Sequence, residues 1–136
     1  MRPSVADLRA FVRRGGKLLL YHGWADQNFS AQSPIDYYRK VVDTIGSAPQ
    51  NADSLRLFLA PGMGHCGGGE GPNTFDMVSA LERWLENKQA PSLIVASHST
   101  DGKVGRTRPL CPYPQVAKHN GTGTLDEAAN FRCVLP

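Results

Sequence analysis

Two short apolar runs, each followed by a loop and then by a helical pattern, constrain the fold of this chain most. The runs are residues 17–21 and 55–60, and glycine, proline or polar residues flank both. Continuous apolar runs of this length are typical of strands that are covered on both faces, as in parallel sheets. Two successive units of strand, loop and helix therefore predict an α/β protein, with a parallel sheet between helices.

Helical spacing of apolar residues predicts helices at residues 5–14, 33–46 and 74–87. Ser4 and Ser33 are expected to cap the first two helices, with Pro34 in the first helical position of the second. The expected buried stripes are Ile35, Tyr38, Val42 and Ile45 in the second helix and Phe75, Val78, Leu81, Trp84 and Leu85 in the third. Residues 47–54 are predicted to be a polar linker, and residues 93–96 a short strand.

The last part of the chain, residues 98–136, shows no clear periodicity and is expected to be irregular, apart from a turn of helix after Thr124. Two of the three cysteines, Cys111 and Cys133, lie in this glycine- and proline-containing tail. A disulfide there would replace missing core, although two free buried thiols are the alternative in a cytosolic protein. Cys66 is left over, which indicates a partner elsewhere, an intermolecular bond or a free thiol.

The loops that follow the two buried strands carry the residues with the clearest chemistry. Asp26 lies in the first loop and His65 in the glycine-rich second loop. Because parallel strands end at the same edge of a sheet, these two loops are expected to lie side by side. A carboxylate next to an imidazole can orient the imidazole and stabilise its charged form during acyl transfer. The order aspartate then histidine is also that of the α/β-hydrolase triad after its serine. Asp26 as a simple turn residue is the alternative.

Three segments resemble the tannase and feruloyl esterase family of α/β-hydrolases, which includes mono(hydroxyethyl) terephthalate hydrolases. Residues 15–26 resemble the strand and loop that bear the acid of the catalytic triad. Residues 56–69, with the string Pro-Gly-Met-Gly-His-Cys, resemble the family's histidine loop. Residues 108–114, Arg-Pro-Leu-Cys-Pro-Tyr-Pro, resemble its closing disulfide-bonded tail together with Phe131, Arg132 and Cys133. The resemblance runs from about residue 7 to the end of the chain.

The resemblance implies a partial α/β-hydrolase fold. Residues 1–97 would be the C-terminal part of the core, and residues 98–136 an irregular tail stapled by a disulfide between Cys111 and Cys133. It further implies that Asp26 is the triad acid and His65 the general base. By the same resemblance, Cys66 would pair with a cysteine beside the nucleophilic serine.

The family's nucleophile segment, Gly-Cys-Ser-x-Gly-Gly, is absent from this sequence. The chain therefore resembles the last quarter of a carboxylic ester hydrolase, and the resemblance leaves open whether it is an enzyme by itself. The family's lid, with its calcium site, also lies in the part that is absent, so no cofactor is expected. A non-catalytic module that associates through an exposed sheet edge is the alternative.

The expected partners are a small aromatic ester, if the chain is active, and a second copy or a complementing chain that supplies the serine. Neither nucleic acid nor membrane is expected, because the net charge is only +3 with scattered basic residues, and no apolar run approaches the ~20 residues that span a bilayer. The resemblance implies a secreted or periplasmic protein, although residues 1–15 do not form a signal peptide.

Two further residues of the first loop, His22 and Trp24, are candidate pocket residues. For His22, a packing or hydrogen-bonding role at the strand end is favoured over a role as base. Trp24 could line a pocket for an aromatic ester or fill space in the structure. No metal site is predicted, because the spacing of His22, Asp26, His65 and Cys66 matches no recurring zinc pattern.

Overall fold

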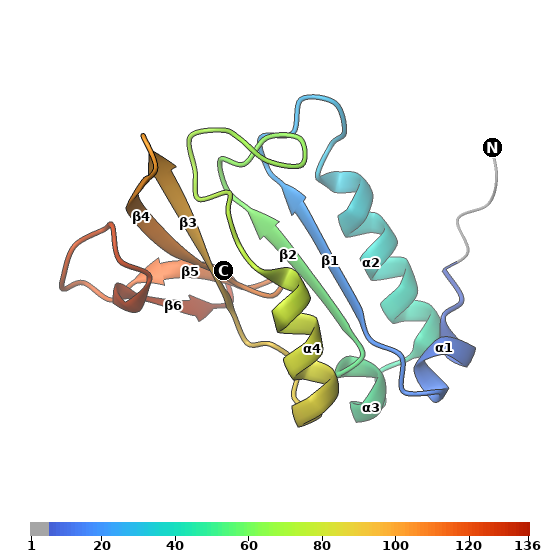
Figure 1. Cartoon of the computed structure of the whole chain (residues 1–136). Helices are drawn as coiled ribbons and strands as arrows, with labels where there is room; N and C mark the ends of the chain where they lie inside the picture. Colours follow the sequence, from blue (N-terminus) through green and yellow to red (C-terminus); the bar gives the residue numbers. More distant parts are fainter. Residues whose placement is uncertain (1–5) are drawn as a thin grey trace.

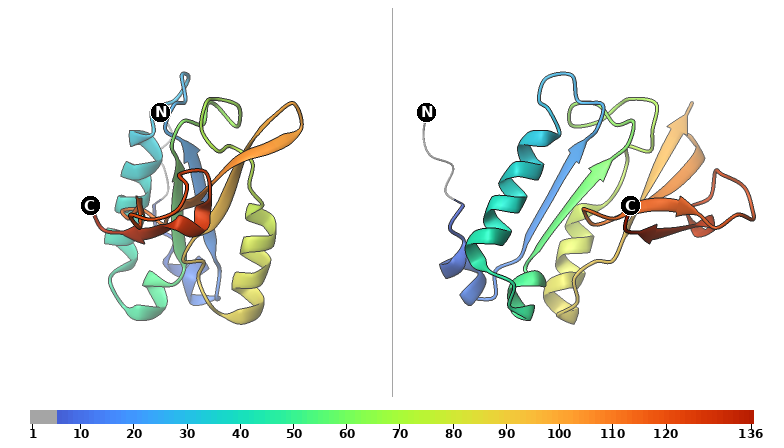
Figure 2. Two further views of the ribbon diagram at one scale, coloured as in Figure 1. Left: turned by 90° about the vertical axis from the view of Figure 1, so that its left-hand side faces the viewer. Right: turned by 180° about the vertical axis from the view of Figure 1, so that it is seen from behind.

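Two parallel strands, β1 (Leu18–Gly23) and β2 (Leu55–Ala60), form the centre of the protein. The computed structural model describes residues 6–136. Helices α2 (Gln32–Ile45) and α4 (Met77–Asn87) lie on opposite sides of the strands, as the left-hand view of Figure 2 shows. The predicted α/β arrangement of parallel strands between helices is therefore present.

Strand β2 supplies much of the core because its side chains alternate between the two helices. Leu57 and Leu59 pack with Ile35 of α2, while Phe58 and Ala60 pack in the cluster that contains Ala80 of α4. The prediction that both faces of this strand are covered is correct. It is wrong for β1, whose residues are mostly half-buried, since within residues 6–136 β1 pairs with β2 alone.

The helices depart from the predicted boundaries at their first residues. Helix α1 is short (Arg9–Arg13), and the predicted cap Ser4 lies outside the described residues. Helix α2 begins at Gln32, two residues before the predicted first helical residue Pro34, so Ser33 is not its cap. Residues 47–54 include a short helix, α3 (Pro49–Ala52), and are not a plain linker.

Helix α4 begins at Met77 and not at residue 74, because Asp76 caps it and accepts a hydrogen bond of 2.9 Å from the backbone N–H of Ser79. Thr74 instead forms a β-bridge with Ser97.

The buried stripes of α2 and α4 are narrower than predicted. In α2, Val41 is fully buried and Val42 is exposed, so the prediction of Val42 as a core residue is wrong. In α4, Trp84 is buried, whereas Val78 and Leu85 are exposed, against the prediction for both. The physical reason is that the two-stranded sheet is too narrow to cover a wide apolar face on either helix.

The tail forms regular structure, and the prediction that residues 98–136 are irregular is wrong. Strands β3 (Ile94–Thr100) and β4 (Lys103–Leu110) form an antiparallel hairpin, and β5 (Val116–His119) pairs with β6 (Phe131–Val134). The short strand expected at residues 93–96 is thus the start of β3. A 3₁₀ turn, η1 (Ala128–Asn130), lies a few residues beyond the expected turn after Thr124. Figure 1 shows both pairs on the β2 side of the sheet.

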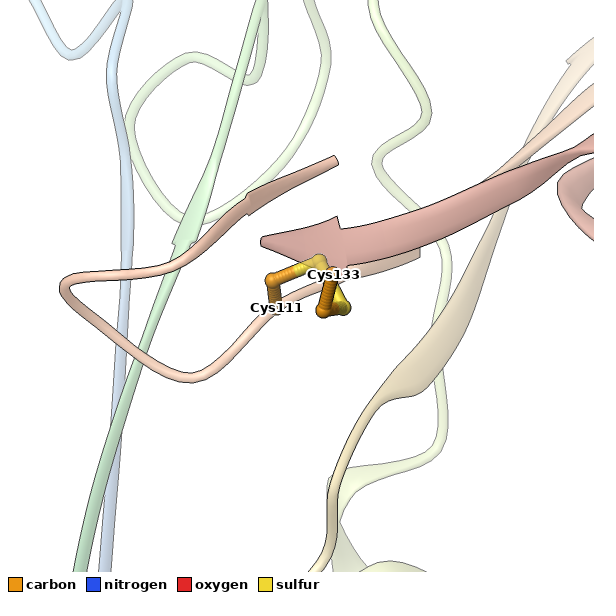
Figure 3. Close-up of a disulfide and its surroundings, with 2 residues drawn as sticks. All are labelled: Cys111 and Cys133. Atoms are coloured by element: carbon orange, nitrogen blue, oxygen red, sulfur yellow. A yellow bond between two sulfur atoms is a disulfide. The ribbon is translucent and has the colours of Figure 1, made fainter. Parts of the chain in front are cut away.

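The tail is fixed to the core by backbone pairing and by one disulfide. The N–H of Tyr113 donates to the carbonyl of Leu57 at 2.7 Å, next to a β-bridge between Phe58 and Pro112. A disulfide joins Cys111, just after β4, to Cys133 in β6 (Figure 3). The disulfide expected in this tail is therefore confirmed.

Candidate active site

The loops after β1 and β2 meet at one edge of the sheet, as the parallel register requires. Gly23 ends β1 opposite Ala60, which ends β2. The N–H of Trp24 donates to the carbonyl of Ala60, and the N–H of Ala25 donates to the carbonyl of Met63, both at 3.0 Å. A side chain at Gly23 would place its Cβ 2.3 Å from the carbonyl oxygen of Met63, so only glycine lets the two loops approach this closely.

Asp26 and His65 form a hydrogen-bonded pair across these loops. Nδ1 of His65 lies 2.9 Å from Oδ2 of Asp26. The other carboxylate oxygen of Asp26 accepts hydrogen bonds from the backbone N–H groups of Asn28 at 2.8 Å and Phe29 at 3.0 Å. Only 3% of the Asp26 side chain is exposed, compared with 43% of the His65 side chain. The aspartate is therefore held in place while the imidazole reaches the surface.

The carboxyl group of Asp26 is ionised over the whole physiological pH range. The hydrogen bond from His65 lowers the pKa of Asp26 to about 2, with help from the backbone N–H groups of Phe29 and Asn28 and against the burial that raises it. An ionised carboxylate only accepts hydrogen bonds, so Nδ1 of His65 must donate. Nε2 of His65 is then the nitrogen that can accept a proton in the neutral ring.

The glycine-rich loop that carries His65 folds back on itself. The N–H of Gly64 donates to the carbonyl of Gly68, and the N–H of Gly71 donates to the carbonyl of Gly62. Gly69 has φ +91°, and a Cβ there would lie 2.1 Å from the carbonyl oxygen of Gly62. Glycine is needed for this tight fold, which presents His65 at its outer side.

The exposed side of His65 faces a hollow of about 500 Å³ between the two loops. Gln27, Asn28 and Glu70 supply its other polar side chains, and no serine or threonine among residues 6–136 lines it. The ring of Phe29, which is largely exposed, lies 5.6 Å from the ring of His65. The sequence interpretation did not single out Phe29. An aromatic residue three positions after the acid was the available signal.

Cys66 directly follows His65 and is exposed, with no disulfide partner among residues 6–136. Its φ of +58° is unusual for a residue other than glycine. Its thiol is therefore free within residues 6–136, in the same loop as His65.

The two candidate pocket residues have different surroundings. Trp24 is half exposed and lines a second cavity of about 690 Å³, which it shares with Leu59 of β2 and Tyr113 of the tail. The structure thus does not bring Trp24 into the hollow of His65. His22 lies in β1 and not in the loop as expected, and its Nε2 is 3.0 Å from the carbonyl oxygen of Phe29 and 3.3 Å from Oδ2 of Asp26.

Among residues 6–136, no group of three or more histidine, cysteine, aspartate or glutamate side chains is arranged to hold a metal ion. In the same part of the chain, no helix has the length and apolar character needed to cross a membrane.

Known proteins resemble this chain over almost its whole length. The family model described as tannase and feruloyl esterase matches residues 1–134. The mono(2-hydroxyethyl) terephthalate hydrolase of Piscinibacter sakaiensis is 49% identical over 134 residues, which are 96% of this chain and 22% of that protein. A probable feruloyl esterase of Arthroderma benhamiae is 38% identical over 135 residues, covering 96% of this chain and 25% of its own length.

Two solved structures show the same agreement in three dimensions. The crystal structure of feruloyl esterase B from Aspergillus oryzae superposes with a TM-score of 0.84 at 30% identity, covering 95% of this chain and 29% of that one. The tannin acyl hydrolase from Aspergillus niger has a TM-score of 0.74 at 25% identity, with 96% and 25% covered. The chain thus spans roughly a quarter of the length of these relatives.

Proposed function

The chain belongs to the tannase and feruloyl esterase family, and we propose that it forms the acid–base part of a carboxylic ester hydrolase acting on esters of aromatic acids. The observation that carries this proposal is the 2.9 Å hydrogen bond between Nδ1 of His65 and Oδ2 of Asp26. The names of the relatives, a mono(2-hydroxyethyl) terephthalate hydrolase and feruloyl esterases, support an aromatic acid as the acyl group.

In the proposed mechanism, His65 is the general base and Asp26 orients it. Nε2 of His65 takes the proton of a serine hydroxyl as its oxygen attacks the ester carbonyl, and the carboxylate stabilises the imidazolium that forms. The imidazolium then returns the proton to the leaving alcohol, and a water molecule repeats the sequence on the acyl-enzyme. The half-exposed Nε2 side of His65 suits this proton transfer.

We propose that the serine comes from a polypeptide segment outside these 136 residues, since the chain spans only about a quarter of its relatives. Cys66 would pair there with a cysteine beside the serine, which would hold the serine close to His65. The disulfide between Cys111 and Cys133 supports a secreted or periplasmic location, because disulfides persist in oxidising compartments.

A chimera tests this proposal directly. The C-terminal region of the Piscinibacter sakaiensis hydrolase that matches this chain is replaced by the chain, and hydrolysis of a feruloyl ester and of mono(2-hydroxyethyl) terephthalate is measured. We expect hydrolysis of at least one ester. Asp26→Asn should lower kcat by about 10⁴-fold and His65→Ala by about 10⁶-fold, by analogy with serine proteases.

Asp101→Asn is the matched control, because it replaces the same type of carboxylate by an amide in an exposed turn between β3 and β4. Its kcat should equal that of the unmodified chimera. An active chimera whose turnover is unaffected by His65→Ala would rule out His65 as the base.

One observation favours a second function, an interaction module without catalysis. Within the described residues the outer edge of β1 is unpaired, and Tyr21 of this strand is partly exposed. Unpaired strand edges favour association with another chain. Sedimentation velocity at low micromolar concentration tests this alternative, and a monomer at every concentration would count against it.

A further inference from the structure

The side chain of His22 occupies a position between two acceptors in the loop that bears the proposed triad acid. His22 is the penultimate residue of β1, four positions before Asp26, and 17% of its side chain is exposed. Its Nε2 lies 3.0 Å from the carbonyl oxygen of Phe29 and 3.3 Å from Oδ2 of Asp26.

These distances determine which nitrogen of His22 carries the hydrogen. A carbonyl oxygen only accepts hydrogen bonds, so Nε2 of His22 must donate. The same nitrogen also lies 3.3 Å from Oδ2 of Asp26, although its hydrogen bond goes to the carbonyl of Phe29. His22 is therefore an Nε2–H donor toward the loop, and this nitrogen is not free to take a proton from a substrate or a serine.

The side chains of His22 and Asp26 both form hydrogen bonds with the backbone of Phe29. Oδ1 of Asp26 accepts from the N–H of Phe29, while the carbonyl of Phe29 accepts from His22. The backbone of Phe29 is thus held on both sides, and its ring contacts the ring of His65. Removal of His22 would free the carbonyl of Phe29 and remove the ring that lies 3.3 Å from Oδ2 of Asp26.

We propose that His22 is a positioning residue, which holds the carboxylate of Asp26 and the backbone of Phe29 so that Oδ2 faces Nδ1 of His65. The effect of His22 on catalysis rests on the proposed function, because His22 would act on the proposed triad acid and, through it, on the proposed base. The positioning itself can be measured on the chain alone. Its consequence is that His65 keeps its hydrogen on Nδ1 and its proton-accepting lone pair on Nε2.

Imidazole ¹H–¹⁵N correlation spectra of the ¹⁵N-labelled full chain report the tautomer of each histidine. The spectra are recorded at about pH 8. We expect His22 as the Nε2–H form and His65 as the Nδ1–H form. In His22→Ala, His65 should become a mixture of both tautomers, because its aspartate is no longer held.

The variant His22→Gln tests whether His22 acts by donating a hydrogen bond or only by filling space with its ring. The amide nitrogen of glutamine can donate to the same carbonyl oxygen, so we expect His65 to return to the Nδ1–H form. His98→Ala is the matched control, because His98 also bonds a backbone carbonyl, that of Gly71 at 3.0 Å, but does not contact Asp26. It should leave the tautomer of His65 unchanged.

The proposal is overturned if His65 remains in the Nδ1–H form in a folded His22→Ala variant, or if His22 of the unmodified chain carries its hydrogen on Nδ1. If His22→Ala does not fold, the test depends on His22→Gln and on the unmodified chain. Mixed tautomers of His65 in folded His22→Gln would then refute the proposal.

In the chimera, His22→Ala should lower kcat by up to about 100-fold with little change in KM, as expected for a displaced catalytic group. A chimera without esterase activity would contradict the proposed function but would not alter the tautomer result.

Discussion

The disulfide between Cys111 and Cys133 should be the largest single stabilising element of the tail. The two cysteines are 22 residues apart in the sequence. In the chain-entropy model, a closed loop of this length stabilises the folded state by about 3.4 kcal/mol, because it restricts the unfolded chain. The double substitution Cys111→Ala and Cys133→Ala removes this restriction without placing a polar atom at the buried Cys111 site.

The corresponding fall in melting temperature follows from the size of the protein. At about 2.1 cal/mol/K per residue, the 136 residues have an unfolding entropy of roughly 0.29 kcal/mol/K. A loss of about 3.4 kcal/mol then lowers Tm by about 12 °C. Thermal unfolding followed by circular dichroism, at equal protein concentration and without reductant, measures this difference.

Cys66→Ala is the control, since Cys66 is exposed and has no disulfide partner among the described residues. Its Tm should stay within about 2 °C of the unmodified chain, as for most surface substitutions. If the double variant loses less than about 4 °C, the bond contributes only about 1 kcal/mol. The argument from loop length would then be refuted, and the backbone pairing of Tyr113 with Leu57 would be sufficient to hold the tail.

Two further predictions concern the candidate active site. The pKa of Asp26 is lowered to about 2, so its ionised form contributes stability that is complete above about pH 4 and is lost as the pH falls through 2. In Asp26→Asn, this part of the acid dependence should disappear from urea unfolding midpoints measured between pH 2 and pH 5. An unchanged dependence of the midpoint on pH would contradict the assignment. Gly23→Ala should lower the free energy of unfolding by about 1–3 kcal/mol, because the new Cβ would lie 2.3 Å from the carbonyl oxygen of Met63. Gly105→Ala, where a Cβ meets nothing within 4 Å, should have little effect on urea unfolding, and equal losses in the two variants would show that the close approach of the loops is unimportant.

Tertiary structure alone decided several features of the fold. Strands β4, β5 and β6 of the tail contain many charged and polar residues, such as Lys103, Arg106 and Arg108, and none has an apolar run as long as those of β1 and β2. They are half exposed and owe their regularity to pairing with each other, which no local pattern reveals. The choice of Val41 over Val42 for the core likewise depends on how α2 lies on the narrow sheet.

The sequence by itself determined the order of strand, loop and helix, and with it the edge at which Asp26 and His65 meet, because parallel strands end on the same side. It also indicated the tail disulfide. What only the folded loop decided is how the acid is held. The N–H of Phe29 donates to the carboxylate of Asp26, and the side chain of His22 donates to the carbonyl of Phe29, so both contacts depend on the turn that residues 22–29 adopt. Such contacts leave no periodic or compositional trace, since they arise from the path of the chain and not from the type of residue.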